Sequence, residues 1–345
     1  MRICLIGTLP EAGREAHKGP ERTTIGLAES LSNRGHEIMV VSDEGEKTTV
    51  DVPAKIIGKD LSPGVDRLTR FYFRVRREID YDTFDVVHAW RPVPDADILS
   101  IHSVGAAEAV EERRSGSFSL RFRGGAKLEL LGKRFAAARA ARTIVTAVPN
   151  VIGATKHGIE PDRVIPVGVN KSFINRSKAV DNEIEILCVG RIEPRKNQAF
   201  PAAHTPDKYT LRLVGPSSTN YKSEIKQFED RWEGKISSEE LIQAYQEADV
   251  FVLPSIFEGF GLTAVEAMAA GTPVVVADTC GVAEHVYDEP IGGVYEFGNR
   301  ESYRYHLERI ISNRVDYGQN AQKYVKENLT WDTIAAQYER EYNRI

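Results

Sequence analysis

The chain has 345 residues, of which 41% are hydrophobic and 28% are charged, a composition typical of a globular protein. Single cores stop growing at roughly 250–300 residues, so this length predicts two domains. Three scattered cysteines exclude a disulfide framework and a cysteine-rich zinc site, which favours a reducing, cytoplasmic compartment. The sequence has no apolar run of about 18 residues that could span a membrane. Its start, MRICLIGTLPEAG, is expected to be a first strand rather than a secretion signal.

The net charge of −5 conceals an asymmetry between the two halves of the chain. Residues 1–180 hold 28 Lys and Arg against 23 Asp and Glu, whereas residues 181–345 hold 17 against 27. The first half therefore carries +5 and the second −10, which suggests two domains with different partners.

Short, unbroken apolar runs, typical of parallel strands buried on both faces, recur along the chain. The predicted strands of the first half are 2–7, 37–42, 84–90, 97–103, 143–148 and 164–169. Those of the second half are 184–190, 209–215, 249–254, 273–278 and 292–297. Helical patterns separate many of them, such as 20–36 and 237–249, and the latter opens with a capping-box spacing from Ser237 to Glu240.

This strand–helix alternation predicts two doubly wound α/β domains. We place the junction in the polar segment 171–183, which gives an N-terminal domain at 1–172 and a C-terminal domain at 173–329. Ligands of open α/β sheets bind beyond the carboxyl ends of the strands, so two facing domains would form a cleft between them.

A basic segment, 113–142, lies in the first half and contains one acid, Glu129. Its nine basic residues are Arg113, Arg114, Arg121, Arg123, Lys127, Lys133, Arg134, Arg139 and Arg142. The interleaved apolar residues are Leu128, Leu130, Leu131, Phe135 and Ala138. This pattern is that of a basic amphipathic helix on an anionic membrane surface, and a solvated helix face packed on the core is the alternative. Nucleic acid is not favoured, because the second half is acidic.

Two cations follow the first strand of the second half, in RIEPRKNQ. Arg191 and Lys196 are separated by a turn at Pro194, so both side chains can point to the same side. Two cations so placed suit a diphosphate, and two solvated surface charges are the alternative.

The stretch SIFEGFGLTAVEAMAAG follows strand 249–254 and is expected to form a glycine-rich turn and a helix. The start of that helix offers backbone N–H groups to an anion, and the glycines allow close approach. Glu258 could accept hydrogen bonds from sugar hydroxyls, and Glu266, one turn inside, could hold a vicinal diol such as a ribose. Alternatively, Glu266 is a helix-dipole partner and Glu258 a loop charge. Together these features describe a nucleotide-sugar site.

The stretches VGRIEPRKNQ, LVGP, ADVFVLPSIFEGFGLTAVEAMAAGTPVVVAD and GVAEHV resemble the donor domain of the family 4 (group 1) retaining glycosyltransferases, which have the GT-B fold. The spacing from Glu258 to Glu266 is that family's E-x7-E signature. In the first half, GLAESLSNRGHEIMVVS, DVVHAW, ILSIHS and VIPVGVNKSF also resemble it. WDTIAAQYEREY is similar to the family's final helix, which implies that helix 330–345 crosses back to the first domain.

The resemblance implies roles for particular positions. The donor-binding residues would be Gly19, Arg191, Lys196, Gly215, Glu258, Gly259, Phe260, Gly261, Leu262, Thr263 and Glu266. Arg191 and Lys196 would bind the diphosphate, together with backbone N–H groups of Leu262 and Thr263. Glu258 would contact the donor sugar and Glu266 the ribose. His102 would lie across the cleft beside the donor sugar, and the base would lie near Gly215 and segment 234–237. The catalytic set would be Glu258, His102, Arg191 and Lys196.

The implied activity is retaining transfer of a hexose-type sugar from a UDP- or GDP-linked donor to a hydroxyl of a glycan or lipid-linked acceptor. The expected setting is cell-envelope polysaccharide or glycoconjugate synthesis, in the cytoplasm or on the inner face of the membrane. No metal or other cofactor is expected, because fixed cations and a helix N-terminus can stabilise the leaving group. The sequence DAD at 95–97 precedes a strand and is interpreted as its polar start, and His88 is interpreted as structural.

Three features depart from the family pattern. The first loop, EAHKGPER, has Gly19 where paired glycines are usual, segment 196–215 is short, and Asn170 stands where Asp is frequent. A sugar-nucleotide epimerase of the same fold, a glycoside phosphorylase and a non-catalytic nucleotide-sugar-binding protein are the alternative functions. A dinucleotide dehydrogenase would need G-x-G-x-x-G after the first strand, and GTLPEAG does not supply it.

Overall fold

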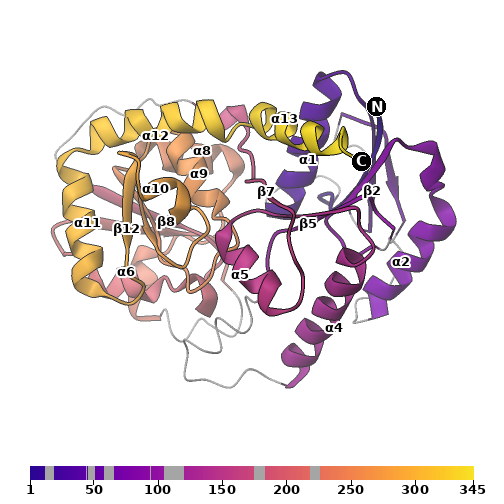
Figure 1. Cartoon of the computed structure of the whole chain (residues 1–345). Coiled ribbons are helices and arrows are strands. Elements are labelled where there is room, and N and C mark those ends of the chain that lie inside the picture. Colours follow the sequence, from indigo (N-terminus) through magenta and orange to yellow (C-terminus); the bar gives the residue numbers. More distant parts are fainter. Residues whose placement is uncertain are drawn as a thin grey trace. The chain divides into compact units, whose positions relative to one another are not determined.

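The computed structural model describes residues 1–11, 19–43, 45, 51–57, 66–93, 95–104, 120–174, 183–217 and 226–345. These residues fall into two compact units (Figure 1). The described residues of the first unit lie within Met1–Ala107, Gly116–Gly168 and Trp331–Ile345. The second unit runs from Val169 to Thr330. The domain boundaries expected from the sequence, after 172 and at 330, lie close to these positions.

The first unit is built on a parallel sheet in the order β3-β2-β1-β4-β5-β6-β7. Its strands are β1 Arg2–Gly7, β2 Glu37–Ser42, β3 Ala54–Ile56, β4 Val86–Ala89, β5 Ile98–Ile101, β6 Arg142–Val145 and β7 Arg163–Val164. The chain order reverses between β1 and β4, so this pair is the switch point of the sheet, where open α/β folds bind ligands.

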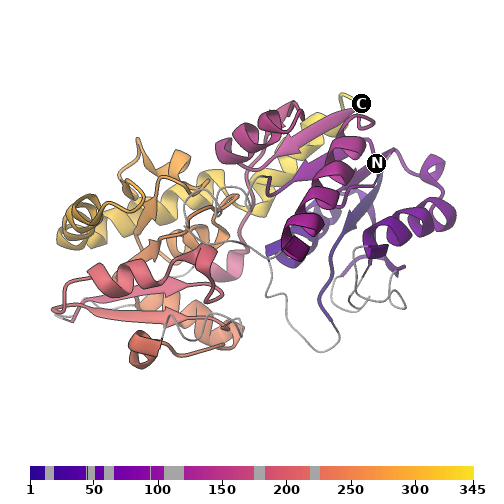
Figure 2. The ribbon, with the colours of Figure 1, turned by 90° about the horizontal axis from the view of Figure 1, so that it is seen from below.

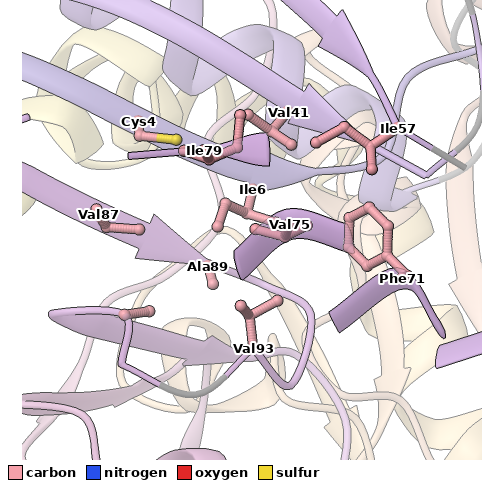
Figure 3. Close-up of a cluster of buried hydrophobic side chains, with 11 residues drawn as sticks. Cys4, Ile6, Val41, Ile57, Phe71, Val75, Ile79, Val87, Ala89 and Val93 are labelled. Atoms are coloured by element: carbon pink, nitrogen blue, oxygen red, sulfur yellow. The ribbon is translucent and has the colours of Figure 1, made fainter. Parts of the chain in front are cut away.

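Helices cover both faces of this sheet. Register places Ile6 beside Ala89, and Ala89 beside Leu99, so these side chains point to one face. That face packs against α2 (Asp66–Glu78), α4 (Leu120–Ala137) and α5 (Val148–Lys156). A cluster of buried hydrophobic side chains lies between α2 and the strands. Figure 3 shows Phe71 and Val75 of α2 against Ile6 and Ala89 of this cluster. The opposite face carries α1 (Gly19–Asn33) and α13 (Trp331–Tyr342), which lie side by side in Figure 1.

The C-terminal helix α13 is an integral part of the first unit. The indole of Trp331 lies against Gly26 of α1, where a built Cβ would be 2.0 Å from its Nε1. Ser30 and Asp332 are hydrogen-bonded at 3.0 Å, and Glu339 pairs with Arg34 and His36. Because α13 closes one face of the sheet, the first unit is assembled from both ends of the chain.

The second unit is built on a parallel sheet in the order β12-β11-β10-β8-β9. Its strands are β8 Glu185–Val189, β9 Thr210–Val214, β10 Val250–Leu253, β11 Val274–Ala277 and β12 Gly292–Tyr295. Its helices are α6 Ala199–His204, α8 Ser238–Glu247, α9 Leu262–Ala269, α10 Ala283–Val286, α11 Arg300–Ser312 and α12 Arg314–Asn328. Short 3₁₀ turns lie at η3 Lys171–Phe173, η4 Pro194–Lys196 and η5 Lys226–Arg231, with η2 Tyr81–Thr83 in the first unit. Here the order reverses between β8 and β10.

The structure confirms the predicted fold class, two Rossmann-like parallel-sheet domains, and the capping box of α8 from Ser237 to Glu240. The strand predicted at 164–169 is wrong beyond Val164. Pro166 has no N–H to donate to a ladder, and Gly168 is pressed under Trp331, where a built Cβ would lie 2.6 Å from the ring. Strand β3 was not predicted, because its three residues are too short to form a pattern. No helix among the described residues is long and apolar enough to cross a membrane.

Candidate functional site

The candidate site of the second unit lies at its switch point, in the loops that follow β8 and β10. Backbone and side-chain hydrogen bonds join these loops. Ile256 N–H donates to Arg195 O at 2.8 Å, and Asn197 Nδ2 donates to Pro254 O at 3.2 Å. Arg195 Nη1 donates to Phe257 O at 3.0 Å. These bonds fix the turn that carries the cations against the turn that carries Glu258.

Glu258 is the centre of the charges at this edge. Its Oε2 accepts a hydrogen bond from Lys196 Nζ and lies 3.2 Å from Arg195 Nη1, while Ser255 Oγ lies 3.5 Å away. The side chain is 17% exposed. Burial acts to raise the pKa of the Glu258 carboxyl, but the charges of Lys196 and Arg195 outweigh it and leave the pKa below its usual value. Glu258 is therefore an ionised hydrogen-bond acceptor at neutral pH.

Arg191 lies at the exposed end of the same network. Its guanidinium is 58% exposed and contacts Glu193 at 3.3 Å, and Glu193 also contacts Arg195 at 2.9 Å. The chain of contacts holds three cations and two carboxylates, so one positive charge is in excess. A network with this balance can accept an anionic group, because one of its positive charges is not neutralised by a carboxylate of the network.

Helix α9 begins shortly after Glu258, at Leu262, with Gly261 as its N-cap. Gly261 has φ = 111°, a left-handed conformation that favours glycine, and no side chain caps the helix. The first backbone N–H groups of a helix have no partner inside it, so those of Leu262 and Thr263 are placed to meet a ligand. The buried Thr263 Oγ1 has no hydrogen-bond partner in the described part of the chain.

Glu266, one turn into α9, is buried. The Tyr245 hydroxyl of α8 donates to its Oε2 at 3.0 Å, and Tyr245 is itself fully buried. The ring of Phe173 lies 5.9 Å from the Tyr245 ring, centre to centre. The sequence predicted Glu266 as a ribose ligand, and the structure adds that a tyrosine 21 positions away holds it.

Gly215 directly follows β9 and lies against Gly190, which directly follows β8. It has φ = 140°, and a built Cβ would lie 2.2 Å from Gly190 O, so no larger residue fits there. Its N–H donates to Gly234 O at 2.7 Å, and Trp232 Nε1 donates to Gly215 O at 2.8 Å. The two segments predicted to lie near the base are therefore neighbours.

In the first unit, His102 follows β5 with a buried Nε2 that has no partner among the described residues. Burial, with a smaller contribution from Lys133, lowers the pKa of His102 to about 4. Trp90 follows β4, with its ring 6.3 Å from the His102 ring. Trp90 Nε1 and Arg91 Nε are also buried without partners in this part of the described chain. The sequence predicted His102 as a site residue but not Trp90 or Arg91, although their place directly after a strand was a usable signal.

His88 and the DAD sequence have the structural roles that were expected. His88 is fully buried, with Nδ1 2.8 Å from Tyr342 Oη and Nε2 2.7 Å from Ser100 Oγ. Burial, with a smaller contribution from His102, lowers its pKa to about 3. Asp95 pairs with Arg76 and Arg139, and Asp97 Oδ2 accepts from Val87 N–H at 2.7 Å. Within the described ranges, no three His, Cys, Asp or Glu residues form a group that could hold a metal ion.

The predicted site residues thus fall into two sets. Arg191, Lys196, Glu258 and the segment 259–263 meet at one edge of the second unit. His102 belongs to the first unit, as does Gly19, which begins α1 and would have no neighbour within 4 Å of a built Cβ. Most of the first loop, residues 12–18, lies outside the described residues. The sequence analysis did not single out Arg195, although RIEPRKNQ shows it as a third cation beside Arg191 and Lys196.

Two protein-family models match the chain. The model for "Glycosyl transferases group 1" matches residues 170–328, and the model for "Glycosyltransferase Family 4" matches residues 17–173. The two matches overlap at residues 170–173 and together span residues 17–328.

Relatives and solved structures agree with these models. An uncharacterized glycosyltransferase of Methanocaldococcus jannaschii is 33% identical over 170 residues, which are 45% of this chain and 43% of that protein. A D-inositol 3-phosphate glycosyltransferase of Geodermatophilus obscurus is 25% identical over 330 residues, 83% of this chain and 73% of that protein. The sucrose-phosphate synthase of Thermosynechococcus elongatus has a TM-score of 0.79 at 21% identity, over 99% of this chain and 98% of that one. At this identity the last likeness shows a common fold.

Proposed function

Because the chain belongs to the group 1, family 4 glycosyltransferases, we propose that it transfers a sugar from a nucleoside-diphosphate sugar to a hydroxyl group of an acceptor. The observation that carries the proposal is the charged network at the switch point of the second unit. In this network Lys196 pairs with Glu258, Arg191 is linked to it through Glu193 and Arg195, and α9 begins shortly after Glu258. We infer that Glu258 accepts hydrogen bonds from sugar hydroxyls.

The diphosphate binds where positive charge is in excess. Its oxygens accept hydrogen bonds from Arg191 and Lys196 and from the backbone N–H groups of Leu262 and Thr263. Lys196 is hydrogen-bonded to Glu258. A bound phosphate draws the Lys196 ammonium toward itself, which releases a carboxylate oxygen of Glu258 for hydroxyls of the donor sugar. Glu266 holds the ribose, and segment 234–237 lies beside the base.

The chemical step breaks the bond between the anomeric carbon and the diphosphate oxygen. The electron pair of that bond goes to the phosphate, and the acceptor oxygen forms the new bond to carbon. The acceptor proton passes to the leaving phosphate on the same face, which retains the anomeric configuration. Arg191, Lys196 and the α9 N-terminus stabilise the charge that develops on the phosphate, so the step needs no metal.

The first unit supplies the acceptor site. Trp90 Nε1, Arg91 Nε and His102 Nε2 are buried polar groups that hydroxyls can satisfy. We propose a glycan or lipid-linked acceptor, a hexose-type donor linked to UDP or GDP, and a role in cell-envelope or glycoconjugate synthesis on the cytoplasmic side. The named activity of the Geodermatophilus relative supports an acceptor rich in hydroxyls.

The test is release of nucleoside diphosphate from a panel of UDP-, GDP-, ADP- and dTDP-sugars, with EDTA present. We expect turnover with one base, and a fall in kcat of at least about tenfold in Arg191→Ala and in Lys196→Met, because each removes about 1.4 kcal/mol or more of transition-state stabilisation. Lys208→Ala is the matched control, since Lys208 is an exposed cation of the same unit that pairs with Glu308.

Two results would contradict the proposal. One is the absence of nucleoside diphosphate release with every donor and acceptor tried. The other is a Lys196→Met variant as active as Lys208→Ala. Product analysis also distinguishes the epimerase alternative. An epimerase would leave an epimerised sugar on the nucleotide, whereas a transferase moves the sugar to the acceptor.

A further inference from the structure

Helices α2, α4 and α5 form one layer on one face of the first unit's sheet. Phe71 and Val75 anchor α2 to it, and Ala136 and Ala154 anchor α4 and α5. Asp95 ties the layer together, because it pairs with Arg76 of α2 at 2.9 Å and with Arg139 after the end of α4. In Figure 2, α2 and α4 lie in front of the strands and α13 (yellow) lies behind them. The outer side of the layer is therefore a surface of the unit.

The outer side of this layer exposes large apolar side chains. On a helix, residues two positions from a buried one point away from it, as Phe73 does between Phe71 and Val75. Leu131 and Phe135 are one turn apart on the outer side of α4, and Val148 and Ile152 repeat that spacing on α5. The exposed fractions are 65% for Phe73, 57% for Leu131, 56% for Phe135, 49% for Val148 and 65% for Ile152.

These five residues stand out against the rest of the molecule. The described residues include nine large hydrophobic side chains that are exposed, so more than half of them lie on three helices. The Arg139 guanidinium lies over the Phe135 ring, 5.6 Å from its centre, so basic and apolar groups are interleaved there.

The same three helices are strongly basic. Their sequences hold eleven Lys and Arg against three Asp and Glu, a net charge of +8 in a chain of net charge −5. Exposed basic residues flank the apolar ones on each helix, namely Arg70 and Arg77 on α2, Lys127 and Arg134 on α4, and Lys156 on α5. The basic segment found in the sequence is thus one part of a larger surface, because α2 and α5 lie outside it.

We propose that the outer side of the α2–α4–α5 layer docks on an anionic lipid bilayer, with Phe73, Leu131, Phe135 and Ile152 in the interfacial region and the basic residues among the headgroups. Apolar residues flanked by Lys and Arg on a helix face are the pattern of interfacial helices. A second copy of this chain would bring two surfaces of charge +8 together. Nucleic acid would engage the charge but leave the apolar residues without a partner.

This inference rests on the surface of the first unit and is independent of the donor site. Together with the proposed function, it would place the enzyme next to a lipid-linked acceptor. Failure of one proposal leaves the other unchanged, because docking is measured without a sugar nucleotide and donor binding is measured without lipid.

The experiment is co-sedimentation of the full-length protein with vesicles of phosphatidylcholine alone and of phosphatidylcholine with phosphatidylglycerol at three to one. We expect binding to the anionic vesicles at 50 mM salt, at least tenfold weaker binding at 500 mM salt, and at least tenfold weaker binding to neutral vesicles. The double variants Leu131→Ser with Phe135→Ser, and Lys127→Glu with Arg134→Glu, should each weaken anionic binding about tenfold or more.

A variant of the second unit, Tyr287→Ser with Tyr305→Ser, is the matched control, because these side chains are 60% and 64% exposed. It should bind the vesicles as the unchanged protein does. All substituted side chains are exposed, so the melting temperature in solution should stay the same in every variant. A variant that melts earlier is replaced by Phe73→Ser or Ile152→Ser.

Three outcomes would overturn the proposal. The first is no binding of the unchanged protein to anionic vesicles at 50 mM salt. The second is binding that the apolar substitutions leave intact and that duplex RNA or DNA competes away, which would make nucleic acid the partner. The third is concentration-dependent self-association that the same substitutions abolish, which would make the layer an interface between copies.

Discussion

Glu258 is the residue at which the loops of the second unit meet. Two cations from the β8 loop neutralise it, and the loop that contains it is fixed by bonds from Arg195 and Asn197. Because contacts within the second unit hold the carboxylate and the cations in place, we propose that a donor exchanges ionic partners on binding instead of building a site. Preorganised charges of this kind stabilise a transition state without reorganisation at the moment of reaction.

Removal of a single atom tests whether the Tyr245 hydroxyl positions Glu266 for ligand binding. Tyr245→Phe removes the hydroxyl that bonds Glu266 Oε2 and leaves the ring in place. A hydrogen bond to a charged group is worth about 1.5–3 kcal/mol, so we expect roughly ten- to hundredfold weaker binding of the nucleoside diphosphate. Isothermal titration calorimetry measures the dissociation constant of the nucleoside diphosphate for both proteins.

The control for that titration is Tyr303→Phe. Tyr303 is also buried in the second unit, and its hydroxyl bonds Thr205 at 2.8 Å, far in sequence from α9. This variant should bind as the unchanged protein does, although it loses a buried hydroxyl too. Equal affinity in both variants would mean that Glu266 does not need Tyr245 to hold the ligand.

The sequence predicted Arg191, Lys196, Glu258 and the 259–263 segment, because each directly follows an apolar run that could only be a strand. It did not predict the contacts of Arg195, whose partner Glu258 is 63 positions away. That contact exists because β8 and β10 are neighbours in the sheet, and strand order is not written in either segment. The pairing of Tyr245 with Glu266 was not predicted either, because it depends on the packing of α8 against α9, which neither segment shows by itself.

Among the elements, α1 and α13 pack closely because Gly26 of α1 leaves room for the indole of Trp331 in α13. A Cβ at Gly26 would lie 2.0 Å from Trp331 Nε1, so Gly26→Ala must displace the indole. Overpacking of this kind costs about 1–3 kcal/mol, and each kcal/mol lowers the melting temperature of a domain this size by about 2–4 °C. Differential scanning calorimetry should show an earlier transition of the first unit.

The matched control is Gly132→Ala, in α4. There the nearest atom to a built Cβ is Pro92 Cγ at 3.4 Å, an ordinary contact. Alanine is a better helix former than glycine by about 1 kcal/mol, so this variant should melt at the same or a higher temperature. If Gly26→Ala melted as late as Gly132→Ala, α13 would not be packed on α1 through that glycine.

The elements themselves were largely predictable, and the exceptions have physical causes. Unbroken apolar runs predicted the strands, since buried parallel strands need no alternation. Segment 164–169 was predicted too long, because its apolar residues serve contacts other than a ladder, such as Gly168 under Trp331. The outer side of α2 was not predicted, because Phe73 can be recognised as exposed only once Phe71 and Val75 are known to face the sheet.

In the molecule as a whole, the two halves of the chain differ in net charge. The first half of the chain carries +5 and the second −10, and a layer of +8 lies on one face of the first unit. The acidic second unit nevertheless concentrates three cations at its switch point. The partner that we propose for the first unit thus follows from its net charge, whereas the ligand that we propose for the second follows from charges gathered at one place.

The most direct test of the central claim, that this switch point binds a nucleoside diphosphate, is thermal stabilisation of the purified protein by UDP, GDP, ADP, dTDP and their sugars in the presence of EDTA. Ligand at about 100 times its dissociation constant should add roughly 2.7 kcal/mol to the stability of the second unit, a clear rise in its melting temperature. We expect such a rise with one base and its loss in Arg191→Ala. No rise with any nucleotide, from a folded sample, would contradict it.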